Sequence, residues 1–266
     1  MPSVLLALPA AAQDTPSAQP DRAFLAPRVD QLEQGQVQVE AGVDVTFAST
    51  DPEVGTIQLA VPDRDETLVQ VPDIQLRYGV LDRLELRVRW FGAGILSVDQ
   101  EAASFATGGT TVTVPAIDST ETDTLPVEIS GKARLLDQAG LLPTISLFAG
   151  AQIATGSGDA IGFGGASWQY SLDGLAVFGT LQAASTNGAN PSFLPSIGVQ
   201  KDWTERFSTY GEVQGLISST LQDVATVQAG GLVKLGDRVR LDASVRTVVG
   251  NQLDDVAFDL GLSIRF

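Results

Sequence analysis

The feature that most constrains this chain is a period of two in its apolar residues, which recurs from residue 36 to the last residue. In the first such segment, Val37, Val39, Ala41, Val43, Val45 and Phe47 alternate with Gln36, Gln38, Glu40, Gly42, Asp44 and Thr46. Successive side chains of a strand point to opposite faces, so this pattern predicts a β-strand with one apolar and one polar face.

The same pattern predicts eleven further strands, which makes twelve in all. They cover residues 68–80, 83–90, 126–135, 143–154, 161–170, 175–184, 193–200, 207–217, 224–234, 239–249 and 256–266. Most have about nine to eleven residues, which is the length that a tilted strand needs to cross a bilayer. Strands of ordinary globular proteins average about half that length.

The connections between these strands differ on the two sides of the predicted sheet. Short turns follow the even-numbered strands, at residues 81–82, 136–142, 171–174, 201–206 and 235–238. Loops follow the odd-numbered strands, at residues 49–67, 91–125, 155–160, 185–192, 218–223 and 250–255, and the first two are much longer than the rest. Bacterial outer-membrane barrels have short periplasmic turns and longer outer loops, so this asymmetry favours such a barrel.

A soluble β-sandwich would also show the alternation, because one face packs and the other meets water. The length of the strands favours the membrane instead. Lipid offers the backbone no hydrogen bonds, so a sheet crosses it only as a closed cylinder with its apolar faces outward. We therefore predict an all-β fold, a closed antiparallel transmembrane β-barrel of about twelve strands.

The polar faces of such a barrel share the lumen, and charged residues stand opposite the apolar set of their own strands. The predicted lumen-lining residues are Glu40, Asp44, Arg77, Glu85, Arg87, Arg89, Glu128, Lys132, Arg134, Glu212, Arg240, Asp242, Arg246, Asp259 and Arg265. Eight are positive and seven negative, so the wall is nearly neutral. Such a wall can line a narrow polar pore, or it can pair with itself and fill a small barrel.

The first two outer loops are strongly acidic. They contain Asp51, Glu53, Asp63, Asp65, Glu66, Asp99, Glu101, Asp118, Glu121 and Asp123, against Arg64 alone. An acidic mouth would concentrate cations and repel anions, and clustered carboxylates can hold divalent ions. A solvated rim without a specific role is the alternative.

Both ends of the chain carry export features. An apolar stretch before Gln13 ends in three alanines, which predicts a residual signal peptide over residues 1–12, although an ordinary flexible terminus would look similar. The Pro- and Gln-rich residues 13–35 then form a predicted periplasmic lead-in before the barrel at 36–266. The last strand ends on Phe266 and resembles the signal that the outer-membrane assembly machinery recognises.

The composition excludes several kinds of chemistry. The chain has no Cys and no His, which removes thiolate nucleophiles, imidazole bases and the commonest zinc ligands. Residues 155–159 (TGSGD) have no helix after them to form a nucleophile elbow, and a turn is the better interpretation. The net charge of −16 argues against nucleic acid as a partner. We expect no enzymatic activity, no cofactor and no metal.

Two stretches resemble a family of outer-membrane proteins from the MetA pathway of phenol degradation. Residues 35–42 (GQVQVEAG) are similar to that family's opening strand, and residues 76–87 (LRYGVLDRLELR) to its second hairpin. Upstream, Asp21-Arg22 departs from the family's usual Arg-Pro-Asp lead-in. The resemblance covers the first third of the chain and implies a transporter whose substrate is poorly defined.

Together these observations predict a transporter or channel for small molecules, hydrophobic or aromatic ones among them, in a Gram-negative outer membrane. A closed barrel with a structural, adhesion or surface-interaction role is the alternative. The expected partners are outer-membrane lipid, lipopolysaccharide and the assembly machinery, and the oligomeric state stays open.

Overall fold

The protein is all-β in the part of the chain that the structure describes. The computed structural model describes residues 21, 25, 27–50, 64–100, 102–107, 110–114, 116–155, 160–186, 191–218, 223–249 and 253–266. Within these ranges, no helix is long and apolar enough to cross a membrane. The predicted signal peptide at residues 1–12 lies outside them and stays a prediction.

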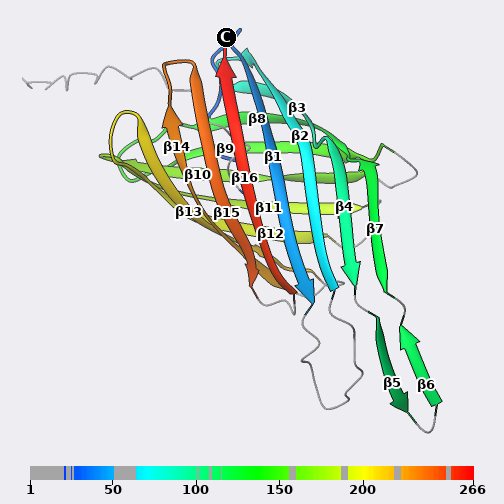
Figure 1. The fold of residues 1–266 in the computed structure, drawn as a ribbon. Helices are drawn as coiled ribbons and strands as arrows, with labels where there is room; N and C mark the ends of the chain where they lie inside the picture. Colours follow the sequence, from blue (N-terminus) through cyan, green and yellow to red (C-terminus); the bar gives the residue numbers. More distant parts are fainter. Residues whose placement is uncertain are drawn as a thin grey trace, which may run out of the picture.

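Twelve strands close into an antiparallel barrel (Figure 1), which confirms the predicted fold. They are β1 (Val37–Thr50), β2 (Arg64–Leu81), β3 (Leu84–Trp90), β8 (Val127–Leu136), β9 (Thr144–Ile153), β10 (Ile161–Leu172), β11 (Leu175–Thr186), β12 (Ser192–Asp202), β13 (Phe207–Leu216), β14 (Val224–Lys234), β15 (Val239–Val249) and β16 (Leu253–Arg265). Because β1 pairs with both β2 and β16, the ladder closes on itself. At the end of the chain, the Phe266 amide donates to the Val37 carbonyl at 2.8 Å.

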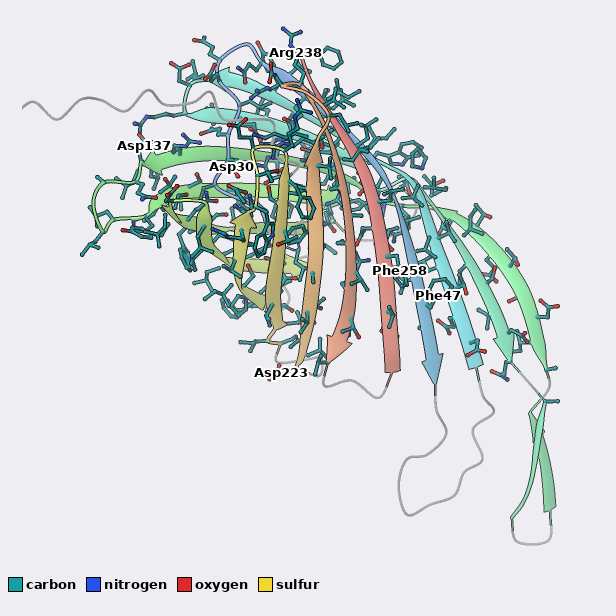
Figure 2. The ribbon with its side chains drawn as sticks, turned by 60° about the vertical axis from the view of Figure 1, so that its left-hand side comes forward. Asp30, Phe47, Asp137, Asp223, Arg238 and Phe258 are labelled. Carbon is teal, nitrogen blue, oxygen red and sulfur yellow. The ribbon has the colours of Figure 1, made fainter. Side chains whose placement is uncertain are left out.

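The two faces of the wall differ as the alternation predicts. On β2, Leu76 and Tyr78 are 45% and 44% exposed, whereas Gln75 and Arg77 beside them are 5% and 1% exposed. Apolar side chains therefore cover the outer surface, and polar ones fill the inside. Phe47 and Phe258 point outward from β1 and β16 (Figure 2), with their rings edge to face and their centroids 6.3 Å apart.

The ends of the barrel also match the predicted connections. The short turns contain Asp137 and Arg238, which lie at one end, and Asp223 lies at the other (Figure 2). The turn end is also where the chain enters β1, since the Gly35 amide donates to the Gly79 carbonyl at 2.8 Å. We call the opposite end the loop end.

The prediction of a long loop over residues 91–125 is wrong. This stretch forms β4 (Ala93–Gln100), β5 (Ala103–Thr107), β6 (Thr110–Val114) and β7 (Ile117–Thr124). β4 continues the direction of β3 and pairs with the first half of β2, and β7 pairs with β4. β4, β7 and the first half of β2 form an extension of the sheet at the loop end, and β5 and β6 pair with each other and reach beyond it (Figures 1 and 2).

Gly92 redirects the chain between β3 and β4. Its φ is +83°, and a Cβ there would overlap the backbone of Pro72 on the neighbouring strand, so the position requires glycine. Beside it, β2 has one more residue than β1 between the residues that pair with Gly42 and Asp44 of β1. Such a bulge exchanges the two faces of a strand.

In the extension, apolar and polar residues therefore occur on both faces, and Glu121 stands beside Leu96 on the inner face and Val69 beside Ile95 on the outer face. Leu68 and Leu96, which form a cross-strand pair, lie on the face that continues the lumen, together with Val98. The outer face has a row of Thr67, Ser97 and Thr120 instead. Asp65, Asp99 and Asp118 follow on this face, so the outer surface becomes polar toward the tip of the extension.

Two neighbouring residues of β11 test which side chains of the wall face outward and which face the lumen. Leu181 is 60% exposed on the outer face, and Gln182 faces the lumen. Leu181→Arg should lower the free energy of unfolding by about 2 to 4 kcal/mol, because it places a charge in lipid near the middle of a strand. Gln182→Arg should cost far less. Urea unfolding of the refolded protein in vesicles measures both, and equal losses would contradict the facing.

Candidate functional site

The lumen holds a segment of the chain that the sequence placed elsewhere. Of the predicted periplasmic lead-in, the described residues at positions 21, 25 and 27–32 lie against the inner wall of the barrel, and residues 33–35 are exposed at the turn end. Arg28, Val29 and Leu32 are almost fully buried there, and Asp30 is seen inside the barrel (Figure 2). We call the described residues 21, 25 and 27–32 the lumen segment.

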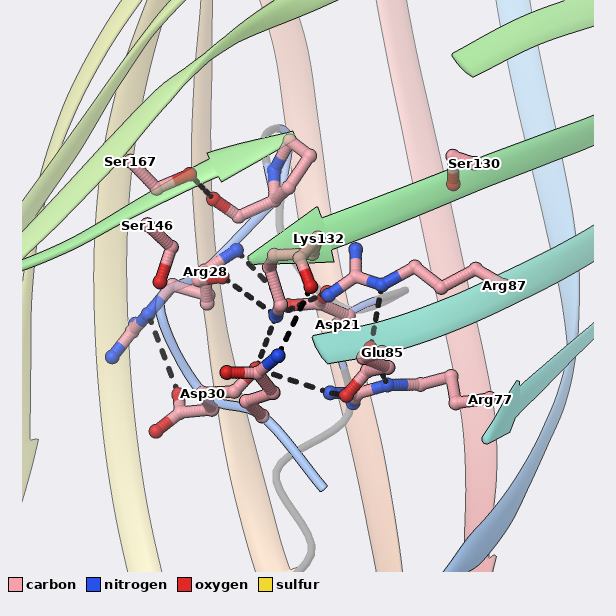
Figure 3. Close-up of polar contacts among 12 residues, drawn as sticks. Asp21, Arg28, Asp30, Arg77, Glu85, Arg87, Ser130, Lys132, Ser146 and Ser167 are labelled. Carbon is pink, nitrogen blue, oxygen red and sulfur yellow. Dashed lines mark hydrogen bonds and ion pairs between the residues drawn. The ribbon is translucent and has the colours of Figure 1, made fainter. Parts of the chain in front are cut away.

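Side chains of the wall satisfy the backbone of the lumen segment. Ser167 and Thr180 donate to the Pro27 carbonyl at 2.6 and 3.1 Å. Lys132 Nζ donates to the Arg28 carbonyl at 2.9 Å, and Glu85 Oε2 accepts from the Leu32 amide at 2.9 Å (Figure 3). An irregular buried backbone needs such partners, because its polar groups make no ladder of their own.

An ion-pair network on β1, β2 and β3 stands beside this segment. Arg77 bonds Glu85 at 2.9 Å and Glu40 at 3.1 Å, and Arg87 bonds Glu85 at 2.6 Å. Asp21 of the lumen segment joins the network through an ion pair with Arg87 (Figure 3). Because all these groups are buried, removing one partner would leave an uncompensated charge.

The charge of Asp21 suits this position. Burial raises the pKa of its carboxyl, but the positive charges of Arg87 and Lys132 lower it more, so the pKa lies below the ordinary value. Asp21 therefore stays ionised at neutral pH and keeps its ion pair.

Arg28 fastens the lumen segment to the other side of the wall. Its guanidinium donates to Gln169 at 2.7 Å and to Gln200 at 3.3 Å. It also stacks 3.8 Å from the centre of the Phe178 ring. Asp21 accepts from the Arg28 amide at 3.0 Å, which links the two anchors of the segment.

A second polar network joins wall strands to one another. Arg246 pairs with Asp44 on β1 and, at 2.8 Å, with Asp259 on β16. Ser244 donates to Asp259 at 3.2 Å and accepts from Gln228 at 2.8 Å. This network crosses β1 and β14 to β16 and makes the wall rigid on that side.

Aromatic rings that face the lumen lie flat against glycines of neighbouring strands. The cross-strand pairs are Phe148 with Gly165, Phe163 with Gly150, Phe178 with Gly198 and Tyr210 with Gly230. A Cβ at any of these glycines would come within 2.8 Å of the ring. The glycines thus keep bulky rings close to the wall and leave room for the lumen segment.

The predicted lumen-lining residues all lie on the inner side of the wall. Nine are buried, namely Glu40, Asp44, Arg77, Glu85, Arg87, Lys132, Glu212, Arg240 and Asp242. Six are half-buried, namely Arg89, Glu128, Arg134, Arg246, Asp259 and Arg265. Whether they act in permeation stays a prediction.

The acidic residues at the loop end lie in strands where the structure describes them. Asp65 and Glu66 are on β2, Asp99 is on β4, and Asp118, Glu121 and Asp123 are on β7. Asp51, Glu53, Asp63 and Glu101 lie outside the described residues. Across the described positions, no group of three or more such side chains is placed to hold a metal ion. An effect on cations stays a prediction.

Two cavities flank the lumen segment. One of about 160 Å³ lies toward the loop end, and Asp21, Leu25 and Pro27 of the segment contribute to its lining. The other, of about 470 Å³, opens between the turns and reaches Gln200, which binds Arg28. The segment therefore separates a space on each side.

Sequence reasoning missed Asp21, Arg28 and Asp30 as lumen residues. An irregular segment has no period, and its partners lie as far as 189 residues away in sequence. The available signal was the presence of charged residues of both signs, among them Asp21, Arg28 and Asp30, between the apolar residues of this stretch.

The packing of rings on glycines gives a test. Gly198→Ala should destabilise the protein by about 1 to 3 kcal/mol, because the Phe178 ring is held between this glycine and Arg28 and cannot retreat. Gly211→Ala is the matched control, since its Cβ would meet only the Gln228 carbonyl oxygen at 3.8 Å. The midpoint of urea unfolding compares them, and equal midpoints would contradict the packing.

No protein-family model matches the chain, and no curated protein matches it. Solved structures with a similar fold include the COG4313 outer membrane channel from Pseudomonas putida F1, at 9% identity and a TM-score of 0.58, covering 90% of this chain and 98% of that one. The TodX deltaS2S3 mutant monoaromatic hydrocarbon channel has 8% identity and a TM-score of 0.50, covering 88% and 91%. The translocator domain of the autotransporter NalP from Neisseria meningitidis has 10% identity and a TM-score of 0.50, covering 90% and 91%. At these identities the comparisons show the fold alone, which is that of outer-membrane β-barrels.

Proposed function

We propose that this protein is an outer-membrane channel for small molecules, hydrophobic or aromatic ones among them, and that the lumen segment closes it. The observation that carries the proposal is the polar attachment of this segment to the wall. The attachment consists of ion pairs and of side-chain bonds to backbone, as in Lys132 to Arg28 and Ser167 to Pro27. Water can replace such bonds one by one, so the segment can leave without exposing a large apolar core.

The direction of withdrawal follows from the connection to β1. The segment enters from the turn end, and Gly35, with a φ of +82°, lies just before β1 begins. A glycine at this point allows the chain to turn without moving the strand. Withdrawal toward the turns would join the two cavities into a continuous path.

The alternative of a closed structural barrel is less well supported. In a barrel whose wall side chains fill the interior, aromatic rings can project into the lumen. Glycines that keep four rings close to the wall are not needed there. Here the freed space is occupied by a segment from outside the sheet. The names of two barrels of similar fold, an outer membrane channel and a monoaromatic hydrocarbon channel, also favour transport.

We place the protein in the outer membrane, with lipid against its apolar belt and lipopolysaccharide around the polar tip of the extension. Phe266 supports recognition by the assembly machinery, because its side chain is exposed at the end of β16.

Single-channel recording of the refolded full chain tests this function. Arg28→Met removes the bonds to Gln169 and Gln200, and hydrogen bonds from charged groups contribute about 1.5 to 3 kcal/mol each. The open probability should therefore rise about tenfold or more. Arg246→Met is the control, because that arginine holds wall strands together. The same change in both variants, or no conductance in either, would count against the proposal.

A further inference from the structure

The cavity on the loop side of the lumen segment has the dimensions of a small-molecule site. Its lining comes from six strands or their ends and from the segment itself, which are far apart in sequence. Its volume of about 160 Å³ is close to that of a cavity of roughly 150 Å³ that holds one benzene ring. A ligand in it is limited to about one ring.

Apolar groups supply part of the lining. Phe91, which follows β3, and Phe163 of β10 line the cavity together with Leu25 and Pro27 of the lumen segment. The Arg89 guanidinium lies 4.4 Å from the centre of the Phe91 ring and holds that ring in place. Flat apolar surfaces of this kind favour a planar ring.

The charged groups of the lining are already compensated. Arg89 binds both oxygens of Asp73, at 2.9 and 2.7 Å. Arg87 is held by Glu85 at 2.6 Å and by Asp21. These arginines therefore offer little to an anion.

The carboxylate that the wall contributes to this cavity is that of Glu128, and it also has hydrogen-bond partners. Glu128 accepts from Ser130 at 3.1 Å and from Gln152 at 3.4 Å. With Asp21 it balances the two arginines, so the lining as a whole is neutral. An uncharged ligand suits it better than a cation.

Gln75 adds a specific requirement. Its side chain lines the cavity and is only 5% exposed, and its amide nitrogen has no acceptor among the described residues. A buried donor without a partner is costly, and an oxygen atom on a ligand would satisfy it.

We infer that this cavity binds an uncharged molecule of about one ring that carries a hydroxyl or carbonyl oxygen, with the oxygen at Gln75 and the ring between Phe91 and Phe163. The inference rests on the proposed channel function. In that channel, this cavity would be the binding position next to the lumen segment on its loop side. Binding is nevertheless a property of the closed protein, because Leu25 and Pro27 complete the site.

Fluorine NMR on the refolded full chain in detergent tests this directly. The probe is 4-fluorobenzyl alcohol, with empty micelles as the blank. We expect saturable binding of the alcohol. Binding at least about fivefold weaker is expected for 4-fluorotoluene, which lacks the oxygen. The charged analogues 4-fluorobenzoate and 4-fluorobenzylammonium should also bind more weakly, and equal binding of either would overturn the assignment of class.

Two variants locate the site. Gln75→Leu should weaken binding of the alcohol and leave that of 4-fluorotoluene unchanged, whereas Gln228→Leu, in the second polar network, should change neither. Phe163→Trp fills the cavity from another strand and should abolish binding of both. Heat-modifiable migration on gels confirms folding. Unchanged binding in every correctly folded variant would overturn the site.

Conductance of the same samples separates this inference from the proposed function. Conductance without saturable binding would refute the site and leave the channel. Saturable binding that depends on Gln75, without conductance under any condition, would refute the channel and leave a binding site in a closed barrel.

Discussion

Every feature of this molecule depends on the need to pair backbone hydrogen bonds in lipid. A sheet meets this need only by closing, and closure turns one face of every strand toward lipid and the other toward a shared interior. The interior must then receive the polar face of twelve strands. Charged groups there are costly without partners, and Arg77, Glu85 and Arg87 show how the wall supplies them to one another.

The lumen segment also compensates charged groups of the wall. Lys132 is wholly buried, and it is compensated largely by the segment, through Asp21 at 3.5 Å and the Arg28 carbonyl at 2.9 Å. The wall and the segment are therefore complementary, which favours the closed state. The second network, centred on Arg246, is complete without the segment, so one side of the wall can keep its shape when the segment leaves.

The fold could be predicted because lipid imposes a period of two on every spanning strand, and residues such as Val37 to Phe47 show it. The extension could not, because Leu68 and Leu96 face inward there and the bulge in β2 interrupts the period of two. The position of the lumen segment was also hidden, because its contacts are side-chain bonds to an irregular backbone.

The most direct measurement is to lock the lumen segment in place. Ser167 donates to the Pro27 carbonyl at 2.6 Å, so the two residues are neighbours, and Pro27→Cys with Ser167→Cys gives one cysteine on the segment and one on the wall in a chain that has no other cysteine. The refolded double variant is recorded in a planar bilayer before and after reduction of the disulfide. We predict no conductance in the oxidised protein and channel openings after reduction. Equal conductance in both states, with the disulfide shown to be formed, would contradict the claim that the lumen segment closes the barrel.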